Sequence, residues 1–253
     1  MSKLQTNQLV SISGAAIGQA FIKFCYFTSC LILLACGQSK KGKTSTETTS
    51  AEEAETTTET DTTNTQTILC FGDSITAGYG LEDTNDAYPN LIQQKIDSLG
   101  LNYTVVNSGV SGETTAGGES RISWVLNQQV DIFLLELGAN DGLRGVALSE
   151  TKANLQSIID TVQKESPDTK IILAGMQLPP NMGNDYTSEF KQLYADLAKK
   201  NDVEFLPFIL QNVGGIEDLN QKDGIHPNVK GHQLVAENVW DVLKPMLSNE
   251  KTS

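Results

Sequence analysis

The stretch Ile68-Leu69-Cys70-Phe71-Gly72-Asp73-Ser74 (ILCFGDS) decides the fold of this chain, because a short apolar run stops at a glycine and polar residues follow at once. A run of this length and composition is typical of a buried β-strand. Similar runs recur along the chain and alternate with segments that carry apolar residues at helical spacing. The expected strands are 68–71, 103–106, 132–137, 171–174 and 203–206, and the expected helices are 88–99, 122–130, 155–162, 190–197 and 234–243.

This alternation predicts an α/β domain, because parallel strands are joined by crossover helices that cover both faces of the sheet. We expect a three-layer α/β/α, flavodoxin-like sandwich around a central parallel five-stranded sheet. It would occupy residues 67–253, a length that is sufficient to bury a core.

The whole chain of 253 residues is acidic, with 18 Lys and Arg against 31 Asp and Glu. This balance argues against a nucleic-acid partner, because phosphate binding needs clustered basic residues. Three of the four Cys lie in the first 36 residues, so Cys70 is alone in the globular part and is expected to be buried in its strand. One Cys and two His argue against a Cys/His zinc site.

Residues 24–35 (FCYFTSCLILLA) form an uncharged apolar run of 12 residues that follows Lys23. A membrane-spanning helix needs about 20 residues, whereas this length is typical of the apolar part of an export signal. The run leads into Leu33-Leu34-Ala35-Cys36-Gly37, which resembles the lipobox of bacterial lipoproteins. The resemblance implies that residues 1–36 are a signal peptide and that Cys36 is lipidated. An ordinary secretory signal or a short N-terminal anchor is the alternative.

Residues 37–66 have no apolar periodicity, and 12 of the 24 residues from Thr44 to Thr67 are Thr. Low hydrophobicity and like charge cannot offset the entropy of ordering, so we expect a disordered tether without a recognition role. Leader and tether together predict an exported protein attached to a membrane by an N-terminal lipid, in the periplasm or at the cell surface.

Polar residues follow the expected strands, where the ligand crevice of a parallel α/β sheet lies. Of the two histidines, His226 is the better candidate for a general base, because Asp223 can reach its ring and stabilise the imidazolium. Taken alone, Asp223 and His226 could equally be a helix cap and an incidental histidine. His232 has no acid nearby and is expected to be structural or on the surface.

Ser74 is the candidate nucleophile, because it comes directly after a strand and a glycine. Its backbone N–H, the backbone N–H of Gly112 and the side-chain amide of Asn140 could together stabilise an oxyanion. Each residue also has a plain structural reading as a cap or a turn. Their joint occurrence with Asp223 and His226, in this order, favours a hydrolytic site.

These residues lie in four sequence blocks that resemble those of the SGNH, or GDSL-type, hydrolases. The blocks are Gly72-Asp73-Ser74-Ile75-Thr76, Gly112, Gly138-Ala139-Asn140-Asp141 and Asp223-Gly224-Ile225-His226-Pro227. The resemblance covers essentially all of residues 67–248. Residues 136–145 (ELGANDGLRG) look like the bacterial thioesterase I, lysophospholipase and arylesterase subgroup, and residues 178–183 (LPPNMG) are similar to its substrate-side loop.

The resemblance implies that Ser74 attacks an ester or thioester carbonyl and that His226, oriented by Asp223, moves the proton. It implies an oxyanion hole made by Ser74, Gly112 and Asn140, and no metal or organic cofactor. Loops that flank the crevice would line an acyl pocket, although the same side chains could simply pack against the sheet. The pocket candidates are Asp141, Gly142, Leu143, Val146, Leu178, Pro179, Pro180 and Met182.

The sequence therefore predicts a monomeric, exported serine esterase with lysophospholipase, arylesterase or thioesterase activity on a small-molecule or lipid ester. A cytosolic acyl-CoA substrate conflicts with export. A carbohydrate O-acetylesterase would use the same residues and is the alternative among enzymes. A noncatalytic surface-binding lipoprotein is the alternative outside enzymes.

Overall fold

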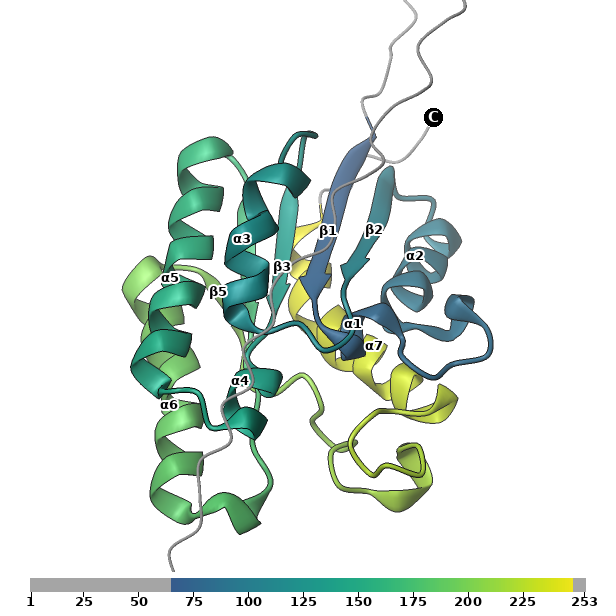
Figure 1. Cartoon of the computed structure of the whole chain (residues 1–253). Helices are drawn as coiled ribbons and strands as arrows, with labels where there is room; N and C mark the ends of the chain where they lie inside the picture. The colour runs from purple at the N-terminus through teal and green to yellow at the C-terminus, as the bar shows by residue number, and fades with distance from the viewer. Residues whose placement is uncertain (1–64, 248–253) are drawn as a thin grey trace, which may run out of the picture. The chain divides into compact units, whose positions relative to one another are not determined.

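The computed structural model describes residues 65–247, which are built around a parallel sheet with the strand order β2-β1-β3-β4-β5 (Figure 1). The strands are β1 (Gln66–Gly72), β2 (Tyr103–Gly109), β3 (Ile132–Glu136), β4 (Lys170–Ala174) and β5 (Glu204–Leu206). All five expected strands are present. Every residue of β3 is buried, as a sheet covered on both faces requires.

Helices cover the two faces of this sheet, so the three-layer α/β/α prediction is confirmed. The longer helices are α2 (Tyr88–Ser98), α3 (Thr115–Val125), α5 (Leu148–Glu165), α6 (Asn184–Asn201) and α7 (Val229–Leu243). Figure 1 shows α2 and α7 on one side of the sheet and α3, α5 and α6 on the other. Four 3-10 turns lie at Thr84–Asp86, Pro180–Met182, Glu217–Leu219 and Lys244–Met246.

The expected helix 122–130 lies nearer the N-terminus in the structure, where α3 begins at Thr115 and ends at Val125. The expected helices 155–162, 190–197 and 234–243 are present inside the longer α5, α6 and α7. Thr114 caps α3 by accepting a hydrogen bond from the N–H of Gly117. Two glycines in the first turns weaken the helical pattern in the sequence. Gly118 is there because the helix packs closely on the sheet. A Cβ at this position would lie 2.4 Å from Leu137 Cδ1.

Two short helices were not expected, α1 (Ser74–Ala77) and α4 (Ala139–Arg144). Each begins shortly after a strand, α1 after β1 and α4 after β3. Both lie at the arrowhead end of the sheet (Figure 1). The strand order reverses between β1 and β3, because the chain leaves β1 for β2 on one side and then crosses to β3 on the other. Such a switch point forms the ligand crevice of open α/β sheets.

The leader 1–36 with Cys36, and the tether except its last two residues, lie outside the described residues. Among residues 65–247, no helix has the length and apolar character needed to cross a membrane. Cys70 lies in β1 and is buried, as expected from the sequence.

Candidate active site

Ser74 is the first residue of α1, directly beyond the carboxyl end of β1. The preceding Asp73 caps this helix, and its Oδ1 accepts a hydrogen bond from the N–H of Ile75 at 3.0 Å. The cap fixes the turn between strand and helix, so the hydroxyl of Ser74 has a defined position at the crevice. Ser74 is mostly buried, with 8% of its surface exposed.

His226 connects Ser74 to Asp223 through two short side-chain contacts. Its Nε2 lies 2.9 Å from Ser74 Oγ, and its Nδ1 lies 2.7 Å from Asp223 Oδ2. The other carboxylate oxygen of Asp223 accepts hydrogen bonds from the N–H groups of Ile225 and His226. The structure thus brings together the three residues that the sequence singled out as nucleophile, base and orienting acid.

These hydrogen bonds and the neighbouring imidazole keep Asp223 ionised. Partial burial works to raise the pKa of Asp223, but the hydrogen bonds from His226 and Ile225 outweigh it and the pKa is lowered. An ionised carboxylate on Nδ1 holds the ring with Nδ1 protonated and leaves Nε2 free to accept the proton of Ser74.

The loop that carries His226 is fastened to the loop that follows α1. Gln221 donates from Nε2 to the carbonyls of Tyr79 and Pro227, at 2.6 and 3.0 Å. Its backbone N–H donates to the carbonyl of His226 at 2.7 Å. The ring of Tyr79 lies 4.8 Å from the imidazole of His226. These contacts set the distance between the histidine and the serine, which come from opposite ends of the domain sequence.

Gly112 lies in the loop after β2 and has a φ of +80°, a conformation that favours glycine. Arg121 braces this loop from α3 through a bidentate ion pair with Glu113, and its guanidinium carbon lies 3.8 Å above the ring of Phe71. Arg144 donates to the carbonyl of Gly112 at 3.0 Å. The loop is therefore attached to both α3 and α4.

Asn140 lies in the first turn of α4, and its amide group already has two acceptors. Nδ2 donates to Asp73 Oδ2 at 3.1 Å and to the carbonyl of Glu113 at 2.9 Å. Since an amide NH₂ has two hydrogens, both are engaged in the free protein. The residues expected to form the oxyanion hole are thus linked to one another through Asp73 and Glu113.

A buried polar cluster lies directly beneath Ser74. Glu136 at the end of β3 accepts hydrogen bonds from the N–H of Asp73 and the hydroxyl of Thr76, and Thr76 Oγ1 lies 2.9 Å from the hydroxyl of Tyr88. Burial raises the pKa of Asp73 to about 6, against several hydrogen bonds that lower it. Burial and then the charge of Asp73 raise the pKa of Glu136 well above its usual range. Burial raises the pKa of the Cys70 thiol to about 12, so that sulfur is not a nucleophile.

The expected pocket residues range from buried to exposed, and Val146, Pro179 and Met182 are half-buried. Asp141 is buried, and its carboxylate accepts hydrogen bonds from the N–H and the hydroxyl of Thr115. Leu178 is buried against Gly142, where a Cβ would lie 2.5 Å from Leu178 Cδ2. For Asp141, Gly142 and Leu178 the structure favours the alternative that they pack within the domain. Leu143 is exposed on α4.

Sequence reasoning did not assign roles to Glu136, Arg121 or Gln221. For Glu136 a signal was available, because it is the one charged residue in an otherwise apolar strand. Arg121 and Gln221 carry no such signal, since an arginine on a helix and a glutamine in a loop are ordinary surface residues.

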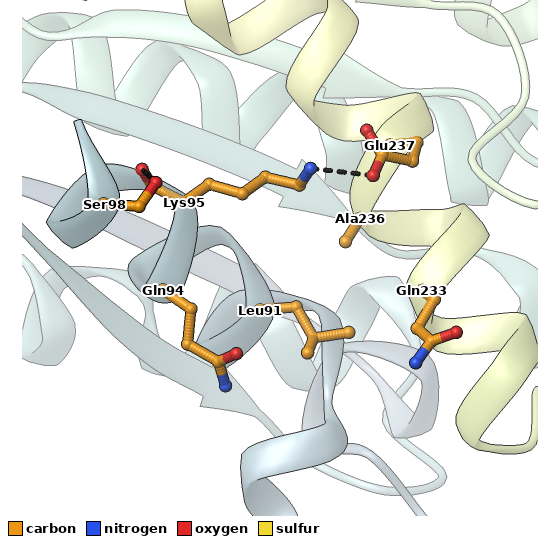
Figure 2. A pocket seen from close by; sticks show the side chains of 7 residues that line it. All are labelled: Leu91, Gln94, Lys95, Ser98, Gln233, Ala236 and Glu237. Carbon is orange, nitrogen blue, oxygen red and sulfur yellow. Dashed lines mark hydrogen bonds and ion pairs between the residues drawn. The ribbon is translucent and has the colours of Figure 1, made fainter.

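A separate hollow of about 280 Å³ lies between α2 and α7 (Figure 2). Its lining includes the ion pair of Lys95 with Glu237 and none of the residues of the candidate active site. Within residues 65–247 no group of three or more His, Cys, Asp or Glu side chains is arranged to hold a metal ion.

The chain is similar to known proteins of one enzyme family. Residues 70–234 match the model of the GDSL-like Lipase/Acylhydrolase family. The chain is 40% identical over 183 residues to Esterase TesA of Pseudomonas aeruginosa, covering 72% of this chain and 90% of the relative. It is 35% identical over 185 residues to Thioesterase 1/protease 1/lysophospholipase L1 of Escherichia coli K12, covering 73% and 86%. A crystal structure of TesA covers 72% of this chain and all of its own, with a TM-score of 0.69.

This chain belongs to the GDSL-like lipase/acylhydrolase family, also known as the SGNH hydrolases. It is a serine esterase, a hydrolase that acts on ester bonds.

Proposed function

We propose that Ser74, His226 and Asp223 carry out ester hydrolysis in this protein through an acyl-enzyme. The observation that supports this most directly is the continuous contact from Asp223 through the imidazole of His226 to Ser74 Oγ, at 2.7 and 2.9 Å. Asp73 Oδ1 is farther from Ser74 Oγ, at 3.5 Å.

The geometry supports a two-step reaction. His226 takes the proton of Ser74 as Oγ attacks the carbonyl carbon, and then gives it to the leaving alcohol or thiol as the bond to that group breaks. Water then attacks the carbonyl carbon of the acyl-enzyme while His226 accepts its proton. The bond from that carbon to Ser74 Oγ breaks, His226 returns the proton to Oγ, and the carboxylic acid is released. Asp223 stabilises the imidazolium during both steps.

The proposed oxyanion hole consists of the N–H groups of Ser74 and Gly112 and the amide of Asn140. Asn140 must exchange one of its two present hydrogen bonds to donate to an oxyanion. We propose that it releases the neutral carbonyl of Glu113 and keeps the bond to Asp73, because a hydrogen bond to a carboxylate is the stronger of the two.

An apolar rim supports a lipophilic ester as the substrate. We propose that the rim consists of Tyr79, Val110, Leu143 and Ile225, which are all exposed and lie on the segments that carry the site residues. The ring of Tyr79 lies beside that of His226, Ile225 precedes His226, Val110 follows β2 and Leu143 lies one turn after Asn140. Exposed apolar side chains that gather around a reactive group mark a binding surface for apolar ligands. A lysophospholipid, an aryl ester or another ester with a long apolar group fits this rim.

A fluorophosphonate probe tests the nucleophile, because it phosphonylates an activated serine. We expect labelling of the wild type and of the control Ser98→Ala, which lies at the end of α2, and none of Ser74→Ala. Labelling that persists in folded Ser74→Ala, or no labelling of the wild type, would contradict the proposal and support a noncatalytic binding protein.

A series of nitrophenyl esters tests the substrate class. We expect activity to increase with acyl length, and the substitution Leu143→Ser to weaken this preference more than the control Trp124→Ser. Trp124 is also exposed and apolar but lies at the end of α3 away from the site. Strict preference for acetate, with activity on acetylated glycans, would instead support the carbohydrate O-acetylesterase.

We further propose that Cys36 carries a lipid that holds the exported domain at a membrane. The support is the apolar run 24–35, which ends in Leu-Leu-Ala directly before Cys36, and the Thr-rich segment that follows. Incorporation of labelled palmitate should be lost in Cys36→Ser and kept in the matched control Cys30→Ser. Equal labelling of both variants would reject the anchor.

A further inference from the structure

We propose that Glu136 is a positioning residue of the hydrolytic site, which acts as a neutral carboxylic acid. In this role it holds Asp73, and through Asp73 the amide of Asn140, without placing a second negative charge behind the oxyanion hole. The inference rests on the proposed role of Asn140 and adds a residue that contacts neither Ser74 nor the substrate.

The contacts of Glu136 connect it to the loop that carries the nucleophile. Its Oε2 accepts hydrogen bonds from the N–H of Asp73 at 3.2 Å and from Thr76 Oγ1 at 2.8 Å. These two residues flank Ser74 in the sequence. One carboxyl oxygen at the end of β3 therefore fixes both sides of the turn from β1 into α1.

Asp73 passes this constraint on to the oxyanion hole. Its Oδ1 accepts the N–H of Ile75, and its Oδ2 accepts a hydrogen at 3.1 Å from Asn140 Nδ2. A displacement of the Asp73 backbone would move the carboxylate that orients the Asn140 amide. Partners of this kind, one step behind the reacting groups, hold catalytic geometry within small tolerances.

The surroundings of Glu136 favour its neutral form. The side chain is completely buried, and Oε1 has no hydrogen-bond partner. Within residues 65–247 no Lys, Arg or His forms an ion pair with it. An unpaired buried oxygen costs far less in a neutral acid than in an isolated carboxylate.

The titratable groups that face Glu136 are also acids rather than bases. They are Asp73 at the end of β1, Cys70 in β1, Tyr88 in α2 and Tyr194 in α6. Burial, reinforced by the charge of Asp73, raises the pKa of Glu136 well above its usual range. The neighbouring pair of carboxyl groups thus carries one proton, on Glu136, and one negative charge, on Asp73.

Neutrality matters for the reaction because negative charge develops on the substrate oxygen. Asp73 already places one carboxylate 3.1 Å from the amide proposed to bind that oxygen. A second buried carboxylate would repel the oxyanion at low dielectric. A neutral acid provides the same acceptor for Asp73 and Thr76 without this repulsion.

Two substitutions separate the acceptor from the charge. Glu136→Met removes the acceptor, and we expect kcat to fall about 10–100-fold with little change in KM, because the oxyanion contact acts on the transition state. Glu136→Gln keeps an acceptor oxygen and no charge, and we expect it to recover kcat to within about threefold of the wild type. If Glu136→Gln loses as much kcat as Glu136→Met, the charge is needed and the proposal fails.

Infrared difference spectroscopy of the free enzyme tests the proton directly. At pH 8 the wild type should have the C=O stretching band of a protonated carboxyl group, which Glu136→Gln lacks and the control Asp73→Asn retains. Absence of the band from the wild type would overturn the proposal, even if Glu136→Met does not fold. This measurement does not depend on Ser74 or on activity. A missing band would reject the role of Glu136, whereas persistent fluorophosphonate labelling of Ser74→Ala would reject the proposed nucleophile.

Discussion

The two histidines of this chain lie close together in the sequence, but the structure gives them opposite surroundings. His226 is in the loop before α7, where Asp223 and Ser74 contact its two ring nitrogens. His232 is inside α7 and buried, and its Nδ1 accepts the backbone N–H of Tyr88 at 3.3 Å. Burial, followed by the charge of His226, lowers the pKa of His232 to about 4.

The groups in contact with an imidazole, rather than the ring alone, determine whether it can act as a base. His226 has a carboxylate at one ring nitrogen and a hydroxyl at the other, which supports its proposed role as the base. Within residues 65–247 no carboxylate forms an ion pair with His232, which stays neutral as a hydrogen-bond acceptor between α7 and α2. The expectation that His232 is structural or on the surface is thereby resolved in favour of a buried structural residue.

The largest expected effect on activity comes from removing the imidazole of His226. His226→Ala should lower kcat by roughly 10⁴–10⁶-fold, since loss of the base disables the serine as well. Steady-state kinetics on a nitrophenyl ester measures this. A loss of kcat below about tenfold would contradict the proposal that His226, unlike His232, acts as the base.

The second effect tests the carboxylate that distinguishes His226. Asp223→Asn keeps the shape but not the charge, and kcat should fall about 10²–10⁴-fold. We expect the lower part of this range because 38% of the Asp223 side chain is exposed and water can partly replace it. An unchanged kcat would mean that the imidazole needs no orienting acid.

The third effect concerns the proposed oxyanion hole beside Ser74. Asn140→Ala should lower kcat about 10²–10³-fold while KM changes little. The control Asn154→Ala removes a nearby amide that donates to Thr115 instead. If both variants behave alike, the loss reflects packing rather than transition-state binding.

The smallest effect on activity is expected at the second histidine. His232→Gln keeps an acceptor for Tyr88 and should leave kcat within about threefold of the wild type. The free energy of unfolding of this variant should fall by about 1–2 kcal/mol, because the ring also fills buried space.

The pH dependence of this stability difference has a defined sign. The pKa of His232 is about 4 in the folded protein and 6.5 as its ordinary value. The native state therefore favours the neutral ring, and this contribution is present above about pH 6.5 and is lost as pH falls towards 4. The difference in Tm between wild type and His232→Gln should shrink across that window. A difference that grows on acidification would contradict the assignment.

Much of the fold was predictable because burial on both faces leaves continuous apolar runs. The runs at 132–137 and 171–174 predict strands for this reason, and β3 and β4 confirm them. The bounds of α3 were not predictable, because Gly117 and Gly118 weaken the helical pattern, and only the close packing on Leu137 explains Gly118. The short helices α1 and α4 are too brief to produce a period.

The site was partly predictable for a different reason. Ser74 and Asn140 come directly after strands, so topology alone places them at one edge of the sheet. Asp141 resembled a pocket residue in the sequence, but its hydrogen bonds to Thr115 place it inside the domain. No local pattern distinguishes a carboxylate that faces a ligand from one that faces a helix.

The sequence by itself determined the alternation of strands and helices, the four blocks of reactive residues and the acidic composition. These properties depend on residue type and spacing along the chain. The tertiary structure decided how closely the imidazole of His226 approaches Ser74, what engages the amide of Asn140 and that Glu136 has no cation beside it in the described residues. These properties depend on contacts between segments far apart in the sequence, where burial removes water and a neighbouring charge sets the protonation of a group.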